Sequence, residues 1–539
     1  MISTGMYLTK LLEAYGVDTV FGIPGVHTVE LYRGLAGSGV RHVTPRHEQG
    51  AGFMADGYAR ATGKPGVCFI ITGPGMTNIL TAMAQAYGDS VPMLVISTVN
   101  SHGRMGSGEG WLHELPDQQA LVSQVSAFSH TVNRPEELAA VVARAFAIFE
   151  GSRPRPVHIE LPINVMLAAA DHLPEPVRAP RLARPAIAAS EIASAANLIE
   201  TARRPVILCG GGARQASIAI RTLAERIDSP VVMTTNARGL LPPDHPLSVS
   251  ISASMPATRT LIAEADVVLA LGTELGPTDY DMYEDGFFGI PGKFIRVDID
   301  PGQIMRGVLP TLGIVGDAET AAVMLAERLS VKEADGAARA RAANEAGLRE
   351  LSGAMQGDIE ILNRLRQALS DTVFVGDSTQ LVYAGNLGFA AAGPGSWFNA
   401  ATGYGTLGYG LPAAIGAKLG CPQRPVIALV GDGGLQFTIA ELGSAMEART
   451  PLILLVFDNK GYGEIKSYMV SQNIPPLGVD LYTPDLASVG RAFGWNVESV
   501  NTLDGLIGAA QASSTAVLPT MIVFGQAVRD EATVVASTA

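Results

Sequence analysis

Short runs of β-branched and other apolar residues recur along the chain, and each run ends close to a glycine or a polar turn. The clearest runs are residues 67–71, 205–209, 267–271, 426–430 and 452–457. Nearly continuous apolar strands of this length are typical of parallel sheets that helices cover on both faces. Helical patterns follow these runs, so the sequence predicts strands and helices that alternate along the chain.

Two stretches of different composition divide the chain. Residues 173–185 are rich in proline and poor in large apolar side chains, which predicts a linker without helix or strand. Residues 331–350 are rich in alanine and arginine, which predicts an exposed connecting helix. We therefore expect three doubly wound α/β domains with parallel sheets, over residues 1–172, 186–330 and 355–539.

Composition and charge narrow the classes of function. The net charge of −13 disfavours unaided binding to nucleic acid or anionic lipid, so a small-molecule substrate is expected. The three cysteines show no spacing of a zinc site or disulfide framework, which fits a reducing cytoplasm. Glu13 and Asp18 interrupt any signal-peptide core, and no apolar stretch is long enough to span a bilayer.

The strongest chemical signal follows the apolar run at residues 426–430. Gly431-Asp432-Gly433-Gly434 comes directly after it, and the run at residues 452–457 is followed by Asp458-Asn459. Parallel strands end at the same edge of a sheet, so Asp432 and Asn459 can point into one crevice. Mg²⁺ prefers oxygen ligands and keeps phosphate oxygens among them, while glycines allow backbone N–H groups to approach a phosphate closely. The pattern predicts a site for magnesium and a diphosphate.

The Gly-Asp-Gly run, with an asparagine 27 positions after its aspartate, resembles the diphosphate motif of thiamine diphosphate enzymes. The resemblance covers most of the chain, in the order found in acetohydroxyacid synthases and related 2-oxo acid decarboxylases. It implies a pyrimidine-binding domain, a middle domain and a diphosphate-binding domain. It also implies that Asp432, Asn459 and the main-chain carbonyl of Gly461 bind Mg²⁺. Alone, the run could form an ordinary tight turn, but its place after a strand and the motifs below favour the cofactor site.

The same resemblance assigns Glu48 to the far end of the cofactor. Thiamine diphosphate must lose a ring proton to its own exocyclic amine, which becomes basic when a carboxylic acid bonds the far pyrimidine nitrogen. Glu48 resembles the family glutamate in this role. A glutamate at the start of a helix can also simply interact with the helix dipole, which contributes under about 1 kcal/mol. Because the diphosphate motif is present as well, we expect Glu48 to be catalytic.

Further segments resemble the cofactor-binding loops of the family. Residues 72–75 would line the pyrimidine, residues 378–380 would donate to the diphosphate, and Leu407 would hold the cofactor bent. Synthases generally carry methionine at the position of Leu407, which weakens the assignment to that branch. The complete set that the resemblance implies for cofactor binding is Thr72, Gly73, Pro74, Asn78, Ser378, Thr379, Gln380, Gly405, Leu407, Gly433, Gly434, Asn459 and Tyr462.

Two other cofactors are not expected. Glycines 210–212 follow an apolar run, but no acidic ribose-binding residue follows at the distance expected of a nicotinamide site. The glycine turn that begins at Gly73 is the other candidate for such a site, but Asn78 stands where its third glycine would be. Acetohydroxyacid synthases hold a structural FAD in the middle domain. Residues 250–262 here lack the Gly-Met-His-Gly pattern of those enzymes, so we predict no FAD.

Residues expected near the reacting end differ from the synthase pattern. Val26 and His27 stand where synthases carry small residues, and His113 stands where they carry glutamine. His27 and His113 are candidate catalytic residues because imidazole transfers protons near neutral pH. A hydrogen-bonded structural histidine is an equally common outcome at either position.

Residues 108–118 and 462–468 look most like decarboxylases of 5-guanidino-2-oxopentanoate, the 2-oxo acid of arginine. A guanidinium group is bound by carboxylates in paired geometry. Glu109, Glu114, Asp117 or Glu464 could supply them. We expect Glu114, Glu464 and Val26 to contact the substrate.

The resemblance implies non-oxidative decarboxylation of a 2-oxo acid to an aldehyde. If a second 2-oxo acid replaces the proton, the same site forms an acetolactate-type product, so a carboligase acting on pyruvate is the main alternative. A non-catalytic subunit that binds thiamine diphosphate is another. Glu48 and the metal ligands lie in different domains, and relatives form such sites between subunits, so we expect a homodimer or a dimer of dimers.

Overall fold

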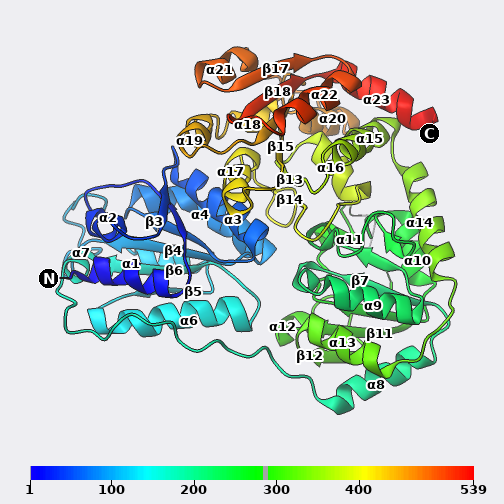
Figure 1. Ribbon diagram of the computed structural model, residues 1–539, viewed down its shortest axis with the longest axis horizontal. Coiled ribbons are helices and arrows are strands. Elements are labelled where there is room, and N and C mark those ends of the chain that lie inside the picture. The colour runs from blue at the N-terminus through cyan, green and yellow to red at the C-terminus, as the bar shows by residue number, and fades with distance from the viewer. Residues whose placement is uncertain (1, 283, 285–288, 539) are drawn as a thin grey trace.

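The structure is a computed structural model that describes residues 2–282, 284 and 289–538. It contains three six-stranded sheets, and each sheet is formed by a different third of the chain (Figure 1). Every pair of neighbouring strands in these sheets is parallel. The predicted architecture of three α/β domains is confirmed, whereas the domain boundaries stay predictions.

The first sheet has the strand order β2-β1-β3-β4-β6-β5. Its strands are β1 (Thr19–Gly22), β2 (Arg41–Val43), β3 (Gly66–Ile70), β4 (Met93–Val99), β5 (Phe128–Thr131) and β6 (Val157–Pro162). Its helices are α1 (Thr4–Ala14), α2 (Val29–Leu35), α3 (Glu48–Thr62), α4 (Pro74–Asp89), α5 (Gln118–Ser123), η1 (Pro135–Glu137), α6 (Leu138–Gly151) and α7 (Ile163–Met166).

The second sheet has the strand order β12-β11-β10-β7-β8-β9. Its strands are β7 (Pro205–Cys209), β8 (Val231–Met233), β9 (Ser248–Val249), β10 (Val267–Leu271), β11 (Lys293–Asp298) and β12 (Leu312–Val315). Its helices are α8 (Ala189–Glu200), η2 (Gly211–Ala213), α9 (Ser217–Ile227), η3 (Thr235–Ala237), α10 (Pro256–Ala263), α11 (Pro277–Tyr280), α12 (Pro301–Ile304) and α13 (Ala318–Arg328).

The third sheet has the strand order β14-β13-β15-β16-β18-β17. Its strands are β13 (Val373–Gly376), β14 (Trp397–Asn399), β15 (Val426–Gly431), β16 (Ile453–Phe457), β17 (Asn496–Val500) and β18 (Thr520–Phe524). Its helices are α15 (Gly353–Ala368), α16 (Gln380–Gly388), α17 (Gly410–Gly420), α18 (Asp432–Leu435), α19 (Glu441–Glu447), α20 (Gly463–Ser471), α21 (Leu486–Ala492), α22 (Leu503–Ser513) and α23 (Gln526–Thr538).

The two connecting segments have the predicted character. Residues 173–185 form no helix or strand. The second connection contains a helix, α14 (Gly336–Glu350), which packs against α10 and buries Ala340 and Ala343 while its other face is exposed. Small apolar side chains are sufficient for this contact, which explains why the segment lacks large ones.

Helices α3 and α17 join the first and third domains in one hydrophobic core. The helices approach so closely that a Cβ atom on Gly57 would lie 1.9 Å from the carbonyl oxygen of Ala413. A Cβ atom on Gly416 would lie 1.9 Å from the carbonyl oxygen of Met54. Glycine is therefore required at both crossings. This packing fixes Glu48, the first residue of α3, relative to the third sheet.

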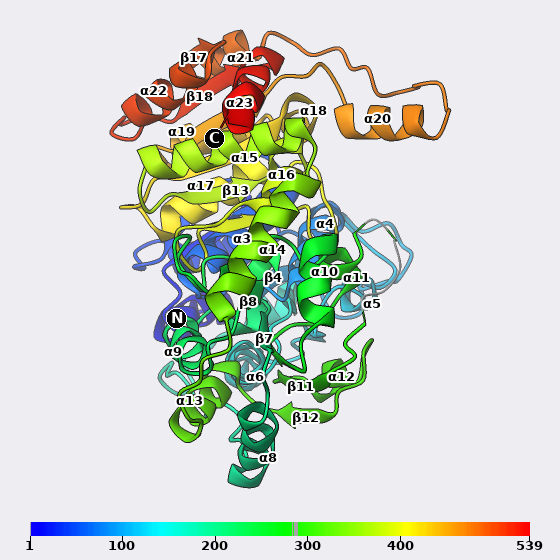
Figure 2. The same cartoon turned by 90° about the vertical axis from the view of Figure 1, so that its right-hand side faces the viewer.

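Helix α20 and the segment that follows it extend away from the rest of the third domain (Figure 2). Several large apolar side chains of this arm are exposed, among them Tyr468, Leu477 and Tyr482. No helix among the described residues is both long enough and apolar enough to cross a bilayer.

Candidate active site

Three neighbouring strands of the third sheet end in the residues predicted to hold a diphosphate. β15 lies between β13 and β16, with Leu429 beside Gly376 and Gly431 beside Phe457. Asp377, Asp432 and Asn459 follow these strands, so they meet at one edge of the sheet. A crevice outside the carboxyl ends of parallel strands is the usual place for a ligand in this kind of fold.

Three oxygen atoms face one another beyond β15 and β16. The oxygen of the Asn459 amide faces the Asp432 Oδ1 atom and the Gly461 carbonyl oxygen. If the amide is turned over, its nitrogen lies 3.0 Å from the Asp432 Oδ1 atom and 2.8 Å from the Gly461 oxygen. Oxygen atoms in this arrangement repel unless a cation lies between them. Neighbouring ligands of octahedral Mg²⁺, at about 2.0–2.1 Å from the ion, are about 2.9 Å apart. The three residues therefore fit a small divalent cation.

Other contacts hold the Asp432 carboxylate in place. Its Oδ2 atom accepts a hydrogen bond of 2.8 Å from the Thr483 hydroxyl, and its Oδ1 atom accepts from the Asn459 backbone N–H at 3.3 Å. Burial raises the pKa of Asp432, while the bond from Thr483 lowers it. A cation at the three oxygens would favour the ionised carboxylate further.

The predicted diphosphate residues surround the same crevice. A Cβ atom on Gly433 would lie 2.8 Å from the Tyr462 ring, and one on Gly434 would lie 3.3 Å from the Asp377 Oδ1 atom. Gln380 accepts a hydrogen bond of 3.0 Å from Arg529 through its Oε1 atom, which leaves its amide nitrogen facing the region of Gly463. Residues that are far apart in the sequence therefore meet at this edge of the sheet.

Asp377 organises this edge, although the sequence did not single it out. Its carboxylate accepts backbone N–H groups of Ser378 at 2.8 Å, Gly408 at 3.1 Å and Gly410 at 3.0 Å. Ser378 in turn donates its hydroxyl to the Thr406 carbonyl at 3.2 Å. These bonds hold both the segment after β13 and the backbone on the C-terminal side of Leu407. Burial raises the pKa of Asp377 to about 6.

Glu48 and Asn78 meet at the pyrimidine end predicted for the first domain. The Asn78 amide donates to the Glu48 Oε2 atom at 2.9 Å. The Glu48 Oε1 atom lies 3.5 Å from the position of a Cβ atom on Gly75, in space that the glycine leaves open. Glu48 is half-buried in the single chain.

Gln118 fixes the turn that leads into α4. Its Oε1 atom accepts from the Thr72 hydroxyl at 2.8 Å and from the Gly73 N–H at 3.1 Å. Its amide nitrogen donates to the Glu160 Oε2 atom at 2.8 Å. Gly73 has a φ of +68°, and a Cβ atom there would lie 2.6 Å from the carbonyl oxygen of His113. Only glycine fits this turn, because both the backbone conformation and the close approach exclude a side chain.

His27 and His113 lie together above this turn. Their rings are 5.2 Å apart and nearly perpendicular, and the buried Nδ1 atom of each has no hydrogen-bond partner among the described residues. Burial and the neighbouring His113 lower the pKa of His27. The backbone of His113 has a φ of +60°, a conformation that costs a non-glycine residue roughly 1–3 kcal/mol. Unpartnered nitrogens and local strain are both common at functional sites.

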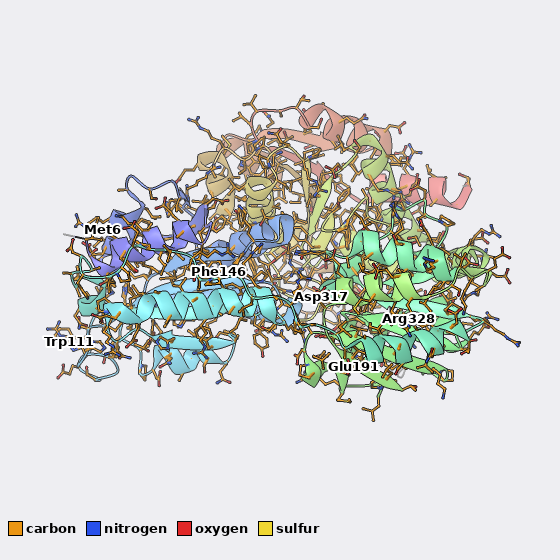
Figure 3. The ribbon with its side chains drawn as sticks, turned by 60° about the horizontal axis from the view of Figure 1, so that its bottom comes forward. Met6, Trp111, Phe146, Glu191, Asp317 and Arg328 are labelled. Atoms are coloured by element: carbon orange, nitrogen blue, oxygen red, sulfur yellow. The ribbon has the colours of Figure 1, made fainter. Side chains whose placement is uncertain are left out.

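The three predicted substrate residues have different surroundings. The Glu114 carboxylate accepts backbone N–H groups of its own loop, from Gly108, Gly110 and Trp111, and these bonds lower its pKa. Trp111 of this loop lies at the outer edge of the first domain, on the side away from the middle domain (Figure 3). Glu464 is exposed, and its carboxylate forms no hydrogen bond or ion pair with the described residues. Val26 is 68% exposed, so its side chain is open to a ligand or a second chain.

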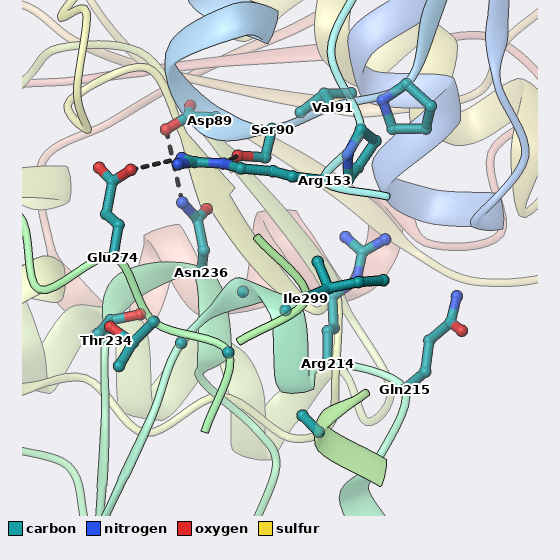
Figure 4. A pocket seen from close by; sticks show the side chains of 18 of the residues that line it. Asp89, Ser90, Val91, Arg153, Arg214, Gln215, Thr234, Asn236, Glu274 and Ile299 are labelled. Atoms are coloured by element: carbon teal, nitrogen blue, oxygen red, sulfur yellow. Dashed lines mark hydrogen bonds and ion pairs between the residues drawn. The ribbon is translucent and has the colours of Figure 1, made fainter. Parts of the chain in front are cut away.

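A separate cavity of about 270 Å³ lies between the first and middle domains. Arg153 crosses it to contact Ser90 and Glu274 (Figure 4). Arg214 extends into it without a hydrogen-bond partner in the described part of the chain. The glycine turn at residues 210–212 and Asp298, which ends β11, also line this cavity. Asp298 is distant from this turn in the sequence, and β11 lies two strands from β7, so Asp298 does not have the spacing that a nicotinamide motif requires.

Sequence reasoning missed Asp377, Gln118 and Thr483. Asp377 had a usable signal, since it directly precedes Ser378, which the resemblance places at the diphosphate. Gln118 and Thr483 had none, because their partners are separated from them by tens of residues and meet them only in the folded chain.

Three matches to known protein families follow the order of the three sheets. Residues 2–121 match the thiamine pyrophosphate enzyme N-terminal TPP binding domain, residues 192–325 match the central domain, and residues 377–524 match the C-terminal TPP binding domain. The residues described above at the two predicted ends of the cofactor lie within the N-terminal and C-terminal matches.

Similar whole proteins include enzymes of two kinds. The chain is 47% identical over 513 residues to a probable 2-ketoarginine decarboxylase of Pseudomonas aeruginosa. The alignment covers 94% of this chain and 90% of that protein. The chain is 32% identical over 467 residues to the large subunit of acetolactate synthase isozyme 1 of Escherichia coli, covering 85% and 82%. It is also 32% identical to a probable acetolactate synthase large subunit of Methanocaldococcus jannaschii, covering 92% and 87%.

We predict that the affinity for thiamine diphosphate falls as the pH is lowered through about 6, because a protonated Asp377 accepts its three backbone N–H groups more weakly and places a donor among them. Since the pKa of Asp377 is raised in the folded chain, burial of this charge costs stability above that pH, and the cost disappears as the pH falls. Asp377→Asn should bind the cofactor about tenfold more weakly at pH 8.

Cofactor titrations of the wild type and Asp377→Asn between pH 5 and 8 measure this effect. The variant controls for protonation of the phosphates of the cofactor, which titrate in the same range. The ratio of the two dissociation constants should approach one at low pH; a constant ratio would contradict the role of Asp377.

Proposed function

The chain belongs to the thiamine pyrophosphate enzyme family, and on that premise we propose that it removes CO₂ from 5-guanidino-2-oxopentanoate to leave an aldehyde. The observation that carries the proposal is the 47% identity, over 94% of the chain, to a probable 2-ketoarginine decarboxylase. 2-Ketoarginine is this 2-oxo acid. Thiamine diphosphate supplies, when bound, the electron sink for the carbon that loses CO₂.

Asp432, Asn459 and the Gly461 carbonyl hold Mg²⁺ in this proposal. The spacing of their oxygens supports it, and the cation in turn holds the diphosphate. Gly433 and Gly434 allow a close approach of phosphate oxygens, and Thr379 and Gln380 donate to them. Ser378 donates as well if its hydroxyl leaves the Thr406 carbonyl. Gly405, Leu407 and Tyr462 complete the wall on this side.

Glu48 holds a proton against the pyrimidine at the other end. Asn78 donates to one carboxylate oxygen and so leaves the other free to share that proton. Thr72, Gly73 and Pro74 form the adjoining wall. His27 and His113 lie beside this wall with unpartnered Nδ1 atoms, and we assign to them the transfer of the proton that replaces CO₂.

Glu464 binds the guanidinium group of the substrate in this proposal. It is the free carboxylate among the predicted substrate residues, and it follows the proposed metal ligand Gly461 by three positions. Partial burial raises the pKa of the half-buried Tyr383, and the charge of Glu464 raises it further. Glu114 has a different part, since its bonds to Gly108, Gly110 and Trp111 shape the loop that carries His113. Val26 lies next to His27 and contacts the carbon chain.

We propose a homodimer as the smallest active unit, with a dimer of dimers as the larger assembly. Large apolar side chains are exposed beside every segment of the site, and such a patch usually marks an interface. They are Val26, Val29, Leu112, Tyr404, Phe437 and Ile465. A second chain that covers these side chains would also enclose the cofactor and exclude water from it.

The middle domain functions without FAD in this proposal. Ile251 and Met255, in the segment that lacks the synthase pattern, pack against Leu387 of α16 and have no surface available to a flavin. Arg214 and the glycine turn at 210–212 would suit a phosphate-bearing ligand, which makes a direct measurement necessary. We expect purified protein to show no flavin absorbance; one flavin released per chain on denaturation would contradict this.

An acetolactate synthase acting on pyruvate is the second candidate, supported by 32% identity to the Escherichia coli enzyme. A non-catalytic cofactor-binding subunit has less support, because Glu48 and the three metal ligands are all present.

We predict that protein supplied with thiamine diphosphate and Mg²⁺ converts 5-guanidino-2-oxopentanoate to 4-guanidinobutanal and CO₂. Glu464→Gln should raise the KM for this substrate about fivefold, because it removes an ion pair that is partly open to water. Turnover of pyruvate should change little, since pyruvate has no cation. Product identification and steady-state kinetics measure both effects.

Glu345→Gln is the matched control, because Glu345 is an exposed helical glutamate on α14. Acetolactate formed from pyruvate at a higher kcat/KM than the guanidino substrate would overturn the substrate assignment. Equal KM values for the wild type and Glu464→Gln would remove Glu464 from the substrate site.

We also predict that Asp432→Asn weakens Mg²⁺-dependent cofactor binding by more than about 100-fold. Loss of a residue that only supports a metal ligand costs up to about 100-fold, and loss of a ligand itself should cost more. Without metal, the Asn459 amide can turn over and donate to Asp432 and Gly461, so chelation should loosen the cofactor without unfolding the chain. Calorimetric titration with and without Mg²⁺ tests this. Asp458→Asn serves as the control because Asp458 pairs with Lys460. Cofactor binding that does not depend on Mg²⁺ would contradict the metal assignment.

A further inference from the structure

The loop at residues 402–410 cannot fix its own backbone. It leads from β14 to α17 and carries Leu407, the residue assigned to hold the cofactor bent. Gly403, Gly405 and Gly408 have φ values of +43°, +74° and +80°. Glycines at positive φ allow such a path but leave it flexible, because no side chain restricts them. Contacts from outside the loop must therefore set the position of Leu407.

One set of contacts comes from the third domain, and all of these except the bond from the Ser378 hydroxyl to the Thr406 carbonyl follow Leu407. Asp377 accepts the N–H groups of Gly408 and Gly410, and the Thr438 hydroxyl donates to the Gly408 carbonyl at 2.9 Å. These bonds fix the C-terminal side of Leu407.

The other set comes from the first domain and precedes Leu407. Gln85, in α4, is completely buried, and its Oε1 atom accepts from the Thr406 hydroxyl at 2.9 Å and from the Thr406 N–H at 3.3 Å. Its amide nitrogen donates to the Asp89 Oδ2 atom at 2.7 Å. Gln85 thus uses both ends of its amide, one on the loop and one on its own helix.

Asp89 holds the beginning of the same loop. It lies one helical turn after Gln85, and its Oδ2 atom accepts from the Thr402 hydroxyl at 2.9 Å and from the Arg60 guanidinium at 2.6 Å. Its Oδ1 atom faces Asn236 of the middle domain at 3.5 Å (Figure 4). Two residues of one helix therefore hold the loop at Thr402 and at Thr406.

We propose that Gln85 is a positioning residue for the cofactor, acting through Thr406 on Leu407. The inference rests on the proposed function, which assigns Leu407 to the cofactor. The N-terminal turn of the same helix forms the pyrimidine wall, and its Asn78 binds Glu48. Within its chain, helix α4 therefore contacts both the pyrimidine wall and the Leu407 loop, which belong to two different sites when each site forms between two chains.

Gln85→Glu tests this role through pH. A protonated carboxyl group can accept from Thr406 and donate to Asp89, as the amide does, whereas an ionised one places two carboxylates side by side. The dissociation constant of thiamine diphosphate for Gln85→Glu, divided by that of the wild type, should be near one at pH 5.5. It should rise about tenfold or more by pH 8. Gln85→Leu should show the weaker binding at every pH.

The dissociation constants are measured by fluorescence titration with thiamine diphosphate and Mg²⁺, together with the melting temperature of each variant. Gln356→Glu is the control, because Gln356 of α15 also donates its amide to two carbonyls, those of Leu348 and Leu351, but does not contact the loop. Its ratio should stay near one.

Two failures are distinguishable. If the wild type does not bind thiamine diphosphate, the proposed function fails. If the wild type binds it and both Gln85 variants bind it equally well at every pH, even with lowered melting temperatures, Gln85 has a structural role alone and the inference is overturned.

Discussion

The three oxygens that face one another beyond β15 and β16 are the constraint on which the site depends. In the proposed function, a cation joins the facing oxygens of an aspartate, an asparagine and a backbone carbonyl. That cation determines where a diphosphate can lie, and the length of the cofactor then determines where its pyrimidine is met. Glu48, from a different sheet, has to stand at that distance, so the contact between domains is part of the chemistry.

Within each chain, a few rigid elements fix the segments that the chain contributes to its sites. Gly57 and Gly416 bring α3 and α17 into close contact, which sets the first residue of α3 against the third domain. Asp377 ties the loop that carries Leu407 to the end of β13, and α4 ties the same loop to the pyrimidine wall. Buried charge is concentrated at these junctions, where Asp377 and Asp89 each accept several donors in place of water.

A contact in the site could be predicted from the sequence when its two residues are close together in the chain. Asp432 and Asn459 are 27 residues apart within one strand-helix-strand unit, so the alternation of strands and helices was sufficient to place them together. Gln85 and Thr406 are 321 residues apart, and no periodic pattern links them. Glu114 was assigned to the substrate by its charge, but the turn around it supplies several N–H donors that a linear sequence does not reveal.

The most direct measurement mixes two inactive variants, Glu48→Gln and Asp432→Asn, under conditions in which the chains exchange. If one cofactor is held by Glu48 of one chain and Asp432 of the other, each hybrid dimer has one intact site and one doubly altered site. Random mixing should then restore about a quarter of wild-type decarboxylase activity, since half of the dimers are hybrids. Hybrid dimers that form, bind cofactor and show no activity would contradict the account.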